Sequence, residues 1–111
     1  MEFENCLFCK IVSGEIDVPR VYEDDEFIAI NDKSPKAPIH VLVIPKEHVD
    51  KRNVEFTRND RFWGAMMGRV GNIVTQLGLS DKGYVLQLNG GGYNHFWHEH
   101  IHILGGLEVE P

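Results

Sequence analysis

The sequence predicts a single α+β domain built on a mostly antiparallel sheet of about five strands, with one long helix and a short N-terminal helix. Two observations lead to this fold class. The expected elements follow the order short helix, three strands, long helix, two strands, and the short connections between successive strands favour antiparallel neighbours. The chain has 111 residues, a length that suits one compact domain over residues 1–111.

The first half of the chain contains the short helix and the first three strands. Residues 6–14, CLFCKIVSG, have apolar side chains at helical spacing and end in a glycine, a common helix terminator. Residues 20–24 and 26–32 predict two strands separated by an acidic turn. The most apolar segment, residues 40–45, predicts a strand that stops at Pro45, because proline has no N–H to donate to a β-ladder.

The second half contains the long helix and the last two strands. Asn59 and Asp60 are good N-capping residues, and Gly78 is expected to end the helix. Residues 84–89 and 96–104 predict strands, with a glycine-rich loop between them. The apolar stripe of the helix consists of Phe62, Met66, Val70, Ile73, Val74 and Leu77.

Charge and hydropathy exclude several classes of partner. The formal net charge is −6, and the 11 Lys and Arg residues form no basic block, so a nucleic-acid groove is not expected. No apolar run approaches the length of a membrane span, and the N-terminus lacks the apolar core of a signal peptide. We therefore expect a cytoplasmic protein without a membrane or nucleic-acid partner.

Three histidines at alternate positions, His98, His100 and His102, mark the last predicted strand. Alternate side chains of a strand share one face, so three imidazoles are expected on one side of the sheet. Imidazole can act as metal ligand, base or nucleophile near neutral pH. The pattern leaves two chemistries open. One is a metal site with an open position for water. The other is an anion site, in which one imidazole attacks phosphorus while the others donate hydrogen bonds.

The two cysteines, Cys6 and Cys9, have the spacing C-x-x-C. In a reducing compartment this spacing indicates half of a metal site or a redox pair rather than a structural disulfide. A pair of cysteines packed against a helix is the third interpretation.

The motif His98-Glu99-His100-Ile101-His102-Ile103-Leu104 resembles the signature of the histidine-triad (HIT) family of nucleotide hydrolases and transferases. The segments CLFCKIVSGEI, YEDDEFIAINDKSPKAPIHVLVIPKEH and the closing LGG resemble the Hint-like branch of that family in content, order and separation. The resemblance covers residues 6–106. It departs at Glu99, because the positions between the histidines are normally apolar.

The resemblance implies hydrolysis of purine nucleoside monophosphate esters, amidates or anhydrides at the α-phosphorus. His100 matches the family's nucleophile, which forms a nucleotidyl-histidine that water hydrolyses. His102 matches a residue that donates to phosphate oxygens or protonates the leaving group, and His40 matches a further site histidine. An alternative function is a nucleotide-binding or scaffold module with little turnover.

The resemblance also implies a nucleotide pocket. Asp32 matches the residue that accepts hydrogen bonds from the ribose hydroxyls, and Asn89 matches a phosphate contact. The family usually has Gly-Gln-Ser just before the triad, where this chain has Tyr93-Asn94-His95; Asn94 replaces the glutamine and His95 adds a titratable ring. The apolar walls of the base pocket are expected to be Leu7, Phe8 and Ile30.

Two further expectations come from the resemblance. Many bacterial HIT proteins have a tetrahedral zinc site, whose ligands match Cys6, Cys9, His48 and His98 in this chain. A structural zinc there would leave His100 and His102 for phosphorus chemistry. A homodimer is also expected, with the long helix and the last-but-one strand pairing across a two-fold axis.

Overall fold

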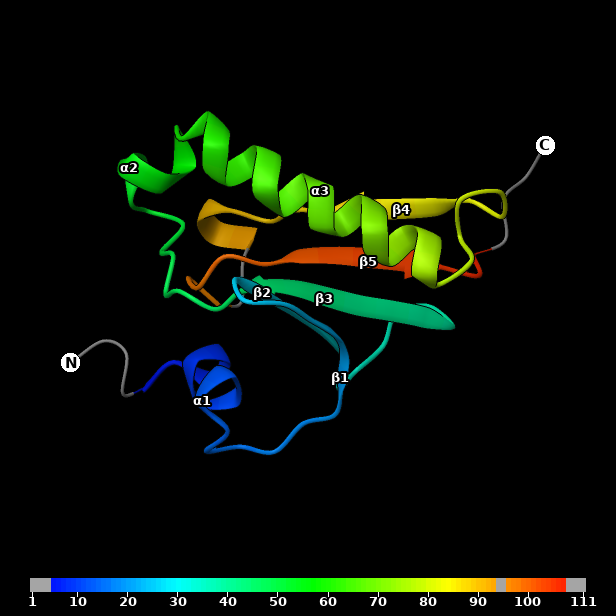
Figure 1. The fold of residues 1–111 in the computed structure, drawn as a ribbon, viewed down its shortest axis with the longest axis horizontal. Helices are drawn as coiled ribbons and strands as arrows, with labels where there is room; N and C mark the ends of the chain where they lie inside the picture. The colour runs from blue at the N-terminus through cyan, green and yellow to red at the C-terminus, as the bar shows by residue number, and fades with distance from the viewer. Residues whose placement is uncertain (1–4, 94–95, 108–111) are drawn as a thin grey trace.

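A computed structural model describes residues 5–93 and 96–107, and a five-stranded antiparallel sheet forms its centre (Figure 1). The strand order is β1-β2-β3-β5-β4, and each pair of neighbours is antiparallel. The predicted α+β class is therefore confirmed. The strands are β1 (Arg20–Glu23), β2 (Phe27–Asn31), β3 (Ile39–Pro45), β4 (Tyr84–Gln87) and β5 (Ile101–Gly105).

The long helix α3 (Asp60–Gln76) packs on one face of the sheet. Asn59 caps its first turn by accepting the N–H of Phe62 at 3.0 Å, as the sequence predicts. From the predicted stripe, four side chains are buried against β2, β3 and β5, whereas Phe62 and Leu77 are partly buried at the edge of the same core. The four buried residues are Met66, Val70, Ile73 and Val74.

The short helix α1 (Leu7–Ser13) packs on the opposite face. It begins after Cys6 and ends at Gly14, whose φ of 86° is the left-handed conformation that glycine adopts without strain. Successive side chains of a strand point to opposite faces of the sheet, and this alternation produces one apolar layer under each helix. In β2, for example, Ala29 belongs to the α3 core and Ile30 to the α1 core.

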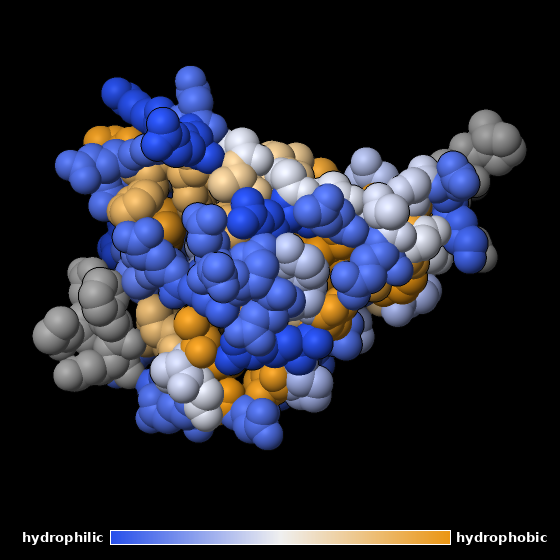
Figure 2. Space-filling view, in the orientation of Figure 1, coloured by the Kyte–Doolittle hydropathy of each residue, from blue (hydrophilic) through white to orange (hydrophobic). Residues whose placement is uncertain are grey.

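Two short helices complete the described chain. The helix α2 (Val54–Thr57) is a single turn capped by the Asn53 side chain, and the sequence analysis did not predict it. The 3₁₀ turn η2 (Gly91–Tyr93) lies in the predicted glycine-rich loop. Figure 2 shows that hydrophilic side chains cover most of the viewed face and that apolar side chains reach the surface in separate patches.

The last strand begins later than predicted, at Ile101 rather than Phe96. The register that pairs Val43 with Ile101 would place Pro45 opposite Glu99, and proline has no N–H to extend the ladder. The preceding residues instead follow the segment after β3, with an isolated bridge between Asp50 and His98. Of the three histidines, only His102 lies within the strand, so the expectation of a single histidine-bearing strand is wrong.

Within residues 5–93 and 96–107, no helix is long and apolar enough to cross a membrane.

Candidate active site

His40 and His102 extend from neighbouring strands, and their rings meet on the α1 face of the sheet. The register of β3 and β5 pairs His40 with Leu104 and Leu42 with His102. This offset brings His40 Nε2 to 2.8 Å from His102 Nδ1. His40 is buried and His102 is partly buried.

The hydrogen bonds around these rings assign their tautomers. His40 Nδ1 accepts the backbone N–H of Lys36 at 3.1 Å, so neutral His40 carries its proton on Nε2. That N–H points to His102 Nδ1, which must therefore accept it. Neutral His102 then carries its own proton on Nε2.

His102 Nε2 is buried, and no described group forms a hydrogen bond with it. A buried donor without a partner costs about 1–3 kcal/mol, so this N–H is suited to an acceptor that a ligand brings. Burial is the main cause that lowers the pKa of His102 to about 4, and the neighbouring His40 makes a smaller contribution. The ring is therefore neutral at physiological pH and can donate from Nε2 to a phosphoryl oxygen.

His100 lies next to His102, with a distance of 5.2 Å between the ring centroids. His100 Nδ1 donates to the carbonyl oxygen of His98 at 2.8 Å, which leaves the lone pair on Nε2. Burial lowers the pKa of His100 to about 4, so the ring is neutral and nucleophilic at pH 7. Its exposed fraction is only 3%, and it lies below the cavity surface rather than among the lining residues.

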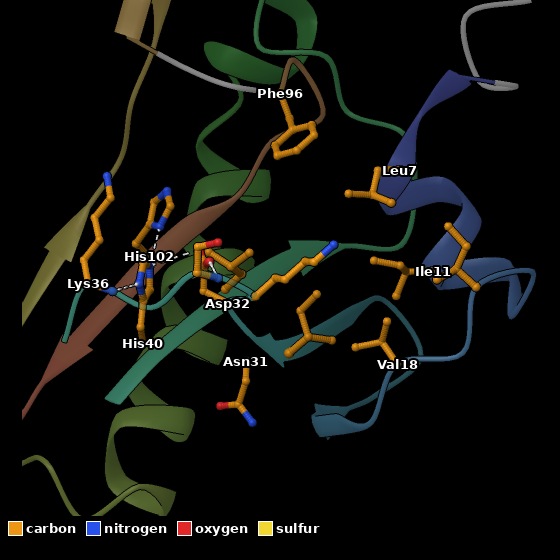
Figure 3. A pocket seen from close by; sticks show the side chains of 14 residues that line it. Leu7, Ile11, Val18, Asn31, Asp32, Lys36, His40, Phe96 and His102 are labelled. Atoms are coloured by element: carbon orange, nitrogen blue, oxygen red, sulfur yellow. Dashed lines mark hydrogen bonds and ion pairs between the residues drawn. The ribbon is translucent and has the colours of Figure 1, made fainter. Parts of the chain in front are cut away.

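A cavity of about 690 Å³ opens beside His40 and His102. Figure 3 shows the two histidines at one side of this cavity, the apolar side chains of Leu7, Ile11 and Val18 at the other, and Asp32 between them. Asp32 lies just after β2. Its Oδ1 accepts the N–H of Ser34 at 2.7 Å, and its Oδ2 lies 3.4 Å from His40 Nε2. The cavity thus combines an apolar wall, one carboxylate and imidazole donors, which is a typical lining for a small-molecule site.

The structure places the predicted pocket residues in three groups. Leu7, Ile30 and Asp32 line the cavity. Phe8 and Asn89 do not: Phe8 is buried with its ring 5.2 Å from that of His100, and the Asn89 side chain accepts from Gln87 at 3.0 Å. The remaining two, Asn94 and His95, lie outside the described residues.

The four predicted metal ligands meet at one place between α1 and the segments that flank the sheet. Their candidate ligand atoms all lie within 4.8 Å of one another. Cys6 Sγ is 3.2 Å from His98 Nδ1, and Cys9 Sγ is 3.1 Å from His48 Nδ1. Two thiols and two imidazoles are a donor set that zinc prefers.

The protonation states of the imidazole and thiol groups in this cluster are suited to binding a metal cation. His98 Nε2 donates to the carbonyl oxygen of Pro45 at 2.8 Å, so the Nδ1 that faces the thiols has its lone pair available. Burial and the neighbouring Cys6 raise the pKa of the Cys9 thiol to about 12, because no positive charge there stabilises a thiolate. A bound metal ion would supply that charge, so the residues fit a structural metal.

A second group of potential ligands, Asp32, His40 and His102, fits a metal less well. His40 Nε2 would have to give up its proton to ligate, and the proton would move to Nδ1, which already faces the Lys36 N–H. This tautomer would place two donors against each other. The three residues are better suited to hydrogen bonding than to metal coordination.

Glu99 has a buried charged partner that the sequence analysis did not identify. The side chains of Lys51 and Glu99 are 5% and 3% exposed, and Lys51 Nζ donates to Glu99 Oε1. The same carboxylate oxygen accepts the backbone N–H of His100 at 3.0 Å. Backbone bonds from Lys51 N–H to the Trp97 carbonyl, at 2.8 Å, and from Glu99 N–H to the Val49 carbonyl, at 2.7 Å, hold the two segments together. The carboxylate is thus tied to the backbone of the candidate nucleophile.

Sequence reasoning also missed Lys36 and Phe96, which line the cavity. The signal for Lys36 was its place in SPKAP, a proline-fixed loop between Asp32 and His40. Phe96 was assigned to the last strand, so its position over α1, 4.8 Å from the Phe8 ring, could not be expected.

The comparisons with known proteins concern the family of this chain. A family profile described as scavenger mRNA decapping enzyme C-terminal binding matches residues 5–107. The protein HitA of Neisseria gonorrhoeae is 42% identical over 103 residues, which cover 92% of this chain and 96% of that protein. A solved HIT family hydrolase from Clostridium thermocellum has a TM-score of 0.85 and 39% identity, and the match covers 97% of this chain and 96% of that one. The chain belongs to the histidine-triad (HIT) family.

This membership confirms the resemblance on which the site residues were assigned. Another HIT relative, the purine nucleoside phosphoramidase of Escherichia coli K12, is 34% identical over 110 residues, covering 97% of this chain and 92% of that protein. Hydrolases are therefore among the HIT proteins that this chain is similar to over nearly its whole length.

Proposed function

We propose that this HIT protein hydrolyses purine nucleoside monophosphate esters, amidates or anhydrides at the α-phosphorus, through a nucleotidyl intermediate on His100. One observation carries the proposal: two neighbouring rings offer complementary groups. His100 Nε2 has a free lone pair, and His102 Nε2 has an N–H without a hydrogen-bond partner among the described residues. The name of the Escherichia coli relative, a purine nucleoside phosphoramidase, supports the same class of substrate.

The cavity suggests how a nucleotide lies. The purine base packs against the apolar wall, which includes Leu7 and Ile30. The ribose hydroxyls donate to the Asp32 carboxylate. This order brings the α-phosphate to His102, whose Nε2–H donates to a phosphoryl oxygen.

The chemistry follows from the tautomers. His100 Nε2 attacks the phosphorus, and the leaving group departs with the electron pair of the bond that breaks. The His100 ring becomes positively charged in this step. The hydrogen bond from His100 Nδ1–H to the carbonyl oxygen of His98 stabilises that charge. Water then attacks the phosphorus, and the bond from phosphorus to His100 Nε2 breaks with its electron pair returning to the ring. The nucleoside monophosphate leaves, His100 returns to its neutral form, and the proton lost by the water passes to the solvent or the departed leaving group.

The Cys6, Cys9, His48 and His98 cluster would hold a structural zinc ion. A closed set of four protein ligands leaves no position for a catalytic water. The role of such an ion is to fix α1 and the His98 segment next to the catalytic rings. The protein would act as a homodimer, in which the exposed apolar edge strand β4 lies at the two-fold axis.

The test is intact-mass spectrometry after incubation with adenosine 5′-phosphoramidate, comparing the wild type with His100→Ala. We expect a wild-type species one AMP heavier, or released AMP, and neither with the variant. Zinc counted on the same samples should be unchanged by His100→Ala, and loss of the metal would favour catalytic zinc on the triad.

A second candidate function is nucleotide binding with little turnover. The observation that favours it is the 3% exposure of His100, which leaves the candidate nucleophile below the cavity surface. In that case nucleotide affinity would persist in both proteins, with neither adduct nor AMP.

A further inference from the structure

The cavity has a charge opposite in sign to that of the whole protein. Among the described residues that line the cavity, Asp32 has the one carboxylate, and the lining also contains the ammonium groups of Lys33 and Lys36 and two imidazoles. The lining is therefore net positive, although the chain has a net charge of −6. A local positive field of this kind favours an anionic ligand.

Lys36 is held next to the catalytic histidines. Its backbone N–H donates to His40 Nδ1, which fixes the start of its side chain beside the His40 and His102 pair. The side chain is exposed at the cavity rim. Burial is the main cause of the lowered pKa of His102, and the nearby positive charge of Lys36 also contributes.

The ammonium group of Lys36 is available to a ligand. Several cations of the described chain are paired with carboxylates, whereas no ion pair of Lys36 is found within the described ranges. The paired cations include Arg20, Lys46, Lys51, Arg52 and Arg69.

The order of groups across the cavity decides which part of a nucleotide Lys36 meets. Figure 3 shows the apolar wall at one side, Asp32 in the middle, then His102, with Lys36 beyond it at the far side. A nucleotide that lies with its base on the apolar wall and its α-phosphate at His102 therefore directs whatever follows the α-phosphate toward Lys36.

We propose that Lys36 is a specificity-determining residue that binds an anionic group attached to the α-phosphate, such as the β-phosphate of a nucleoside diphosphate or polyphosphate. This inference rests on the proposed nucleotide site. It assigns to Lys36 a preference for anionic leaving groups over neutral or cationic amines. The contact is a charge-assisted hydrogen bond from Nζ to a phosphoryl oxygen.

The test is a binding comparison that needs no turnover. We would measure the affinities of AMP and of α,β-methylene-ADP, which cannot be cleaved at the bridging position, by calorimetry in magnesium-free buffer. Wild type should bind α,β-methylene-ADP more tightly than AMP. Lys36→Gln should reduce this preference about fivefold, as expected for one partly exposed charge contact, while AMP affinity changes little. Lys36→Arg should retain the preference.

Two controls separate position from charge. Lys82→Gln removes an exposed ammonium group outside the cavity lining and changes the net charge equally, so it should leave both affinities unchanged. Raising the salt concentration should reduce the wild-type preference, because mobile ions screen an exposed contact.

Each other result contradicts the inference in a distinct way. Equal losses for both nucleotides with Lys36→Gln would place Lys36 on the α-phosphate, and an unchanged ratio would leave it without a role in selection. In both cases the proposed nucleotide site would stand. If wild type bound neither nucleotide, the proposed function and this inference would both fail.

Discussion

Lys51 and Glu99 form a buried ion pair directly behind the candidate nucleophile. Breaking such a pair leaves an uncompensated charge in the interior, whereas replacing both partners with apolar residues is often neutral. We expect Lys51→Met to lower the free energy of unfolding by about 3–5 kcal/mol and the double variant Lys51→Met/Glu99→Leu to recover most of that loss.

Urea denaturation of the wild type and the two variants measures this difference. Lys46→Met is a matched control, because Lys46 is paired with Glu23 at the surface. It should lower the free energy of unfolding by at most about 1 kcal/mol. A double variant no more stable than Lys51→Met would show that the carboxylate stabilises the protein mainly through the His100 N–H rather than through Lys51.

The metal cluster predicts that substitution of one of its ligands and substitution of His100 have different effects on metal binding. Cys9→Ala removes one of four ligands and should abolish stoichiometric zinc and lower the melting temperature, since metal binding contributes to folding. His100→Ala should keep about one zinc ion per chain, as a closed Cys₂His₂ site requires. Elemental analysis with thermal unfolding of the same samples checks both. Retention of zinc by Cys9→Ala would contradict the proposed ligand set.

The tautomer assignment of His102 predicts its titration. Because burial disfavours the charged ring, its pKa lies at about 4 rather than near the ordinary value, so the neutral form persists at any pH above that. Long-range ¹H–¹⁵N spectra should show the Nε2-protonated tautomer at pH 6 and protonation only as the pH falls toward 4. His102→Ala assigns the signals. A midpoint near pH 6.5 would mean that the ring is solvated rather than buried.

Buried neutral histidines also make stability depend on pH. The pKa values of His98, His100 and His102 are all lowered to about 4, so between that pH and about 6.5 the unfolded chain binds more protons than the folded chain. The free energy of unfolding should therefore fall as the pH drops through this window. Urea titrations at pH 7 and pH 5 measure the effect, and equal stabilities at both values would contradict it.

The sequence predicted the fold well because each element had a local signal. The apolar stripe of α3 has the helical period, and Asn59 and Gly14 cap helices through their own backbone chemistry. The end of β3 was also predicted by a local signal, Pro45. Its effect on β5 was not, because the loss of pairing at Glu99 depends on the register between two strands far apart in the chain.

The candidate site was predictable only where side chains had a recognisable pattern. The four candidate ligands of the metal cluster were found through the resemblance of the chain to the HIT family, and the structure brings them together. Phe8 was assigned to the pocket wall, but the helix turns it toward the rings of His98 and His100. The Lys51 and Glu99 pair depends on a segment crossing that no sequence spacing reveals.

The edge strand β4 carries the last prediction. Its residues Tyr84, Val85 and Leu86 are 46%, 47% and 36% exposed, and Met67 of α3 is 44% exposed. Among the strands that the structure describes, β4 pairs only with β5 and forms one edge of the sheet. An exposed apolar edge of this kind favours pairing with another chain, and a two-fold axis would bury it in a homodimer.

We expect Val85→Lys to convert the protein to a monomer, because each copy would place a charge in the interface and the symmetry doubles the effect. Light scattering coupled to size-exclusion chromatography measures the mass. Val54→Lys is the matched control: Val54 is 56% exposed but lies on α2, so its dimer should persist. A Val85→Lys protein that remained dimeric, with an unchanged melting temperature, would move the interface away from β4.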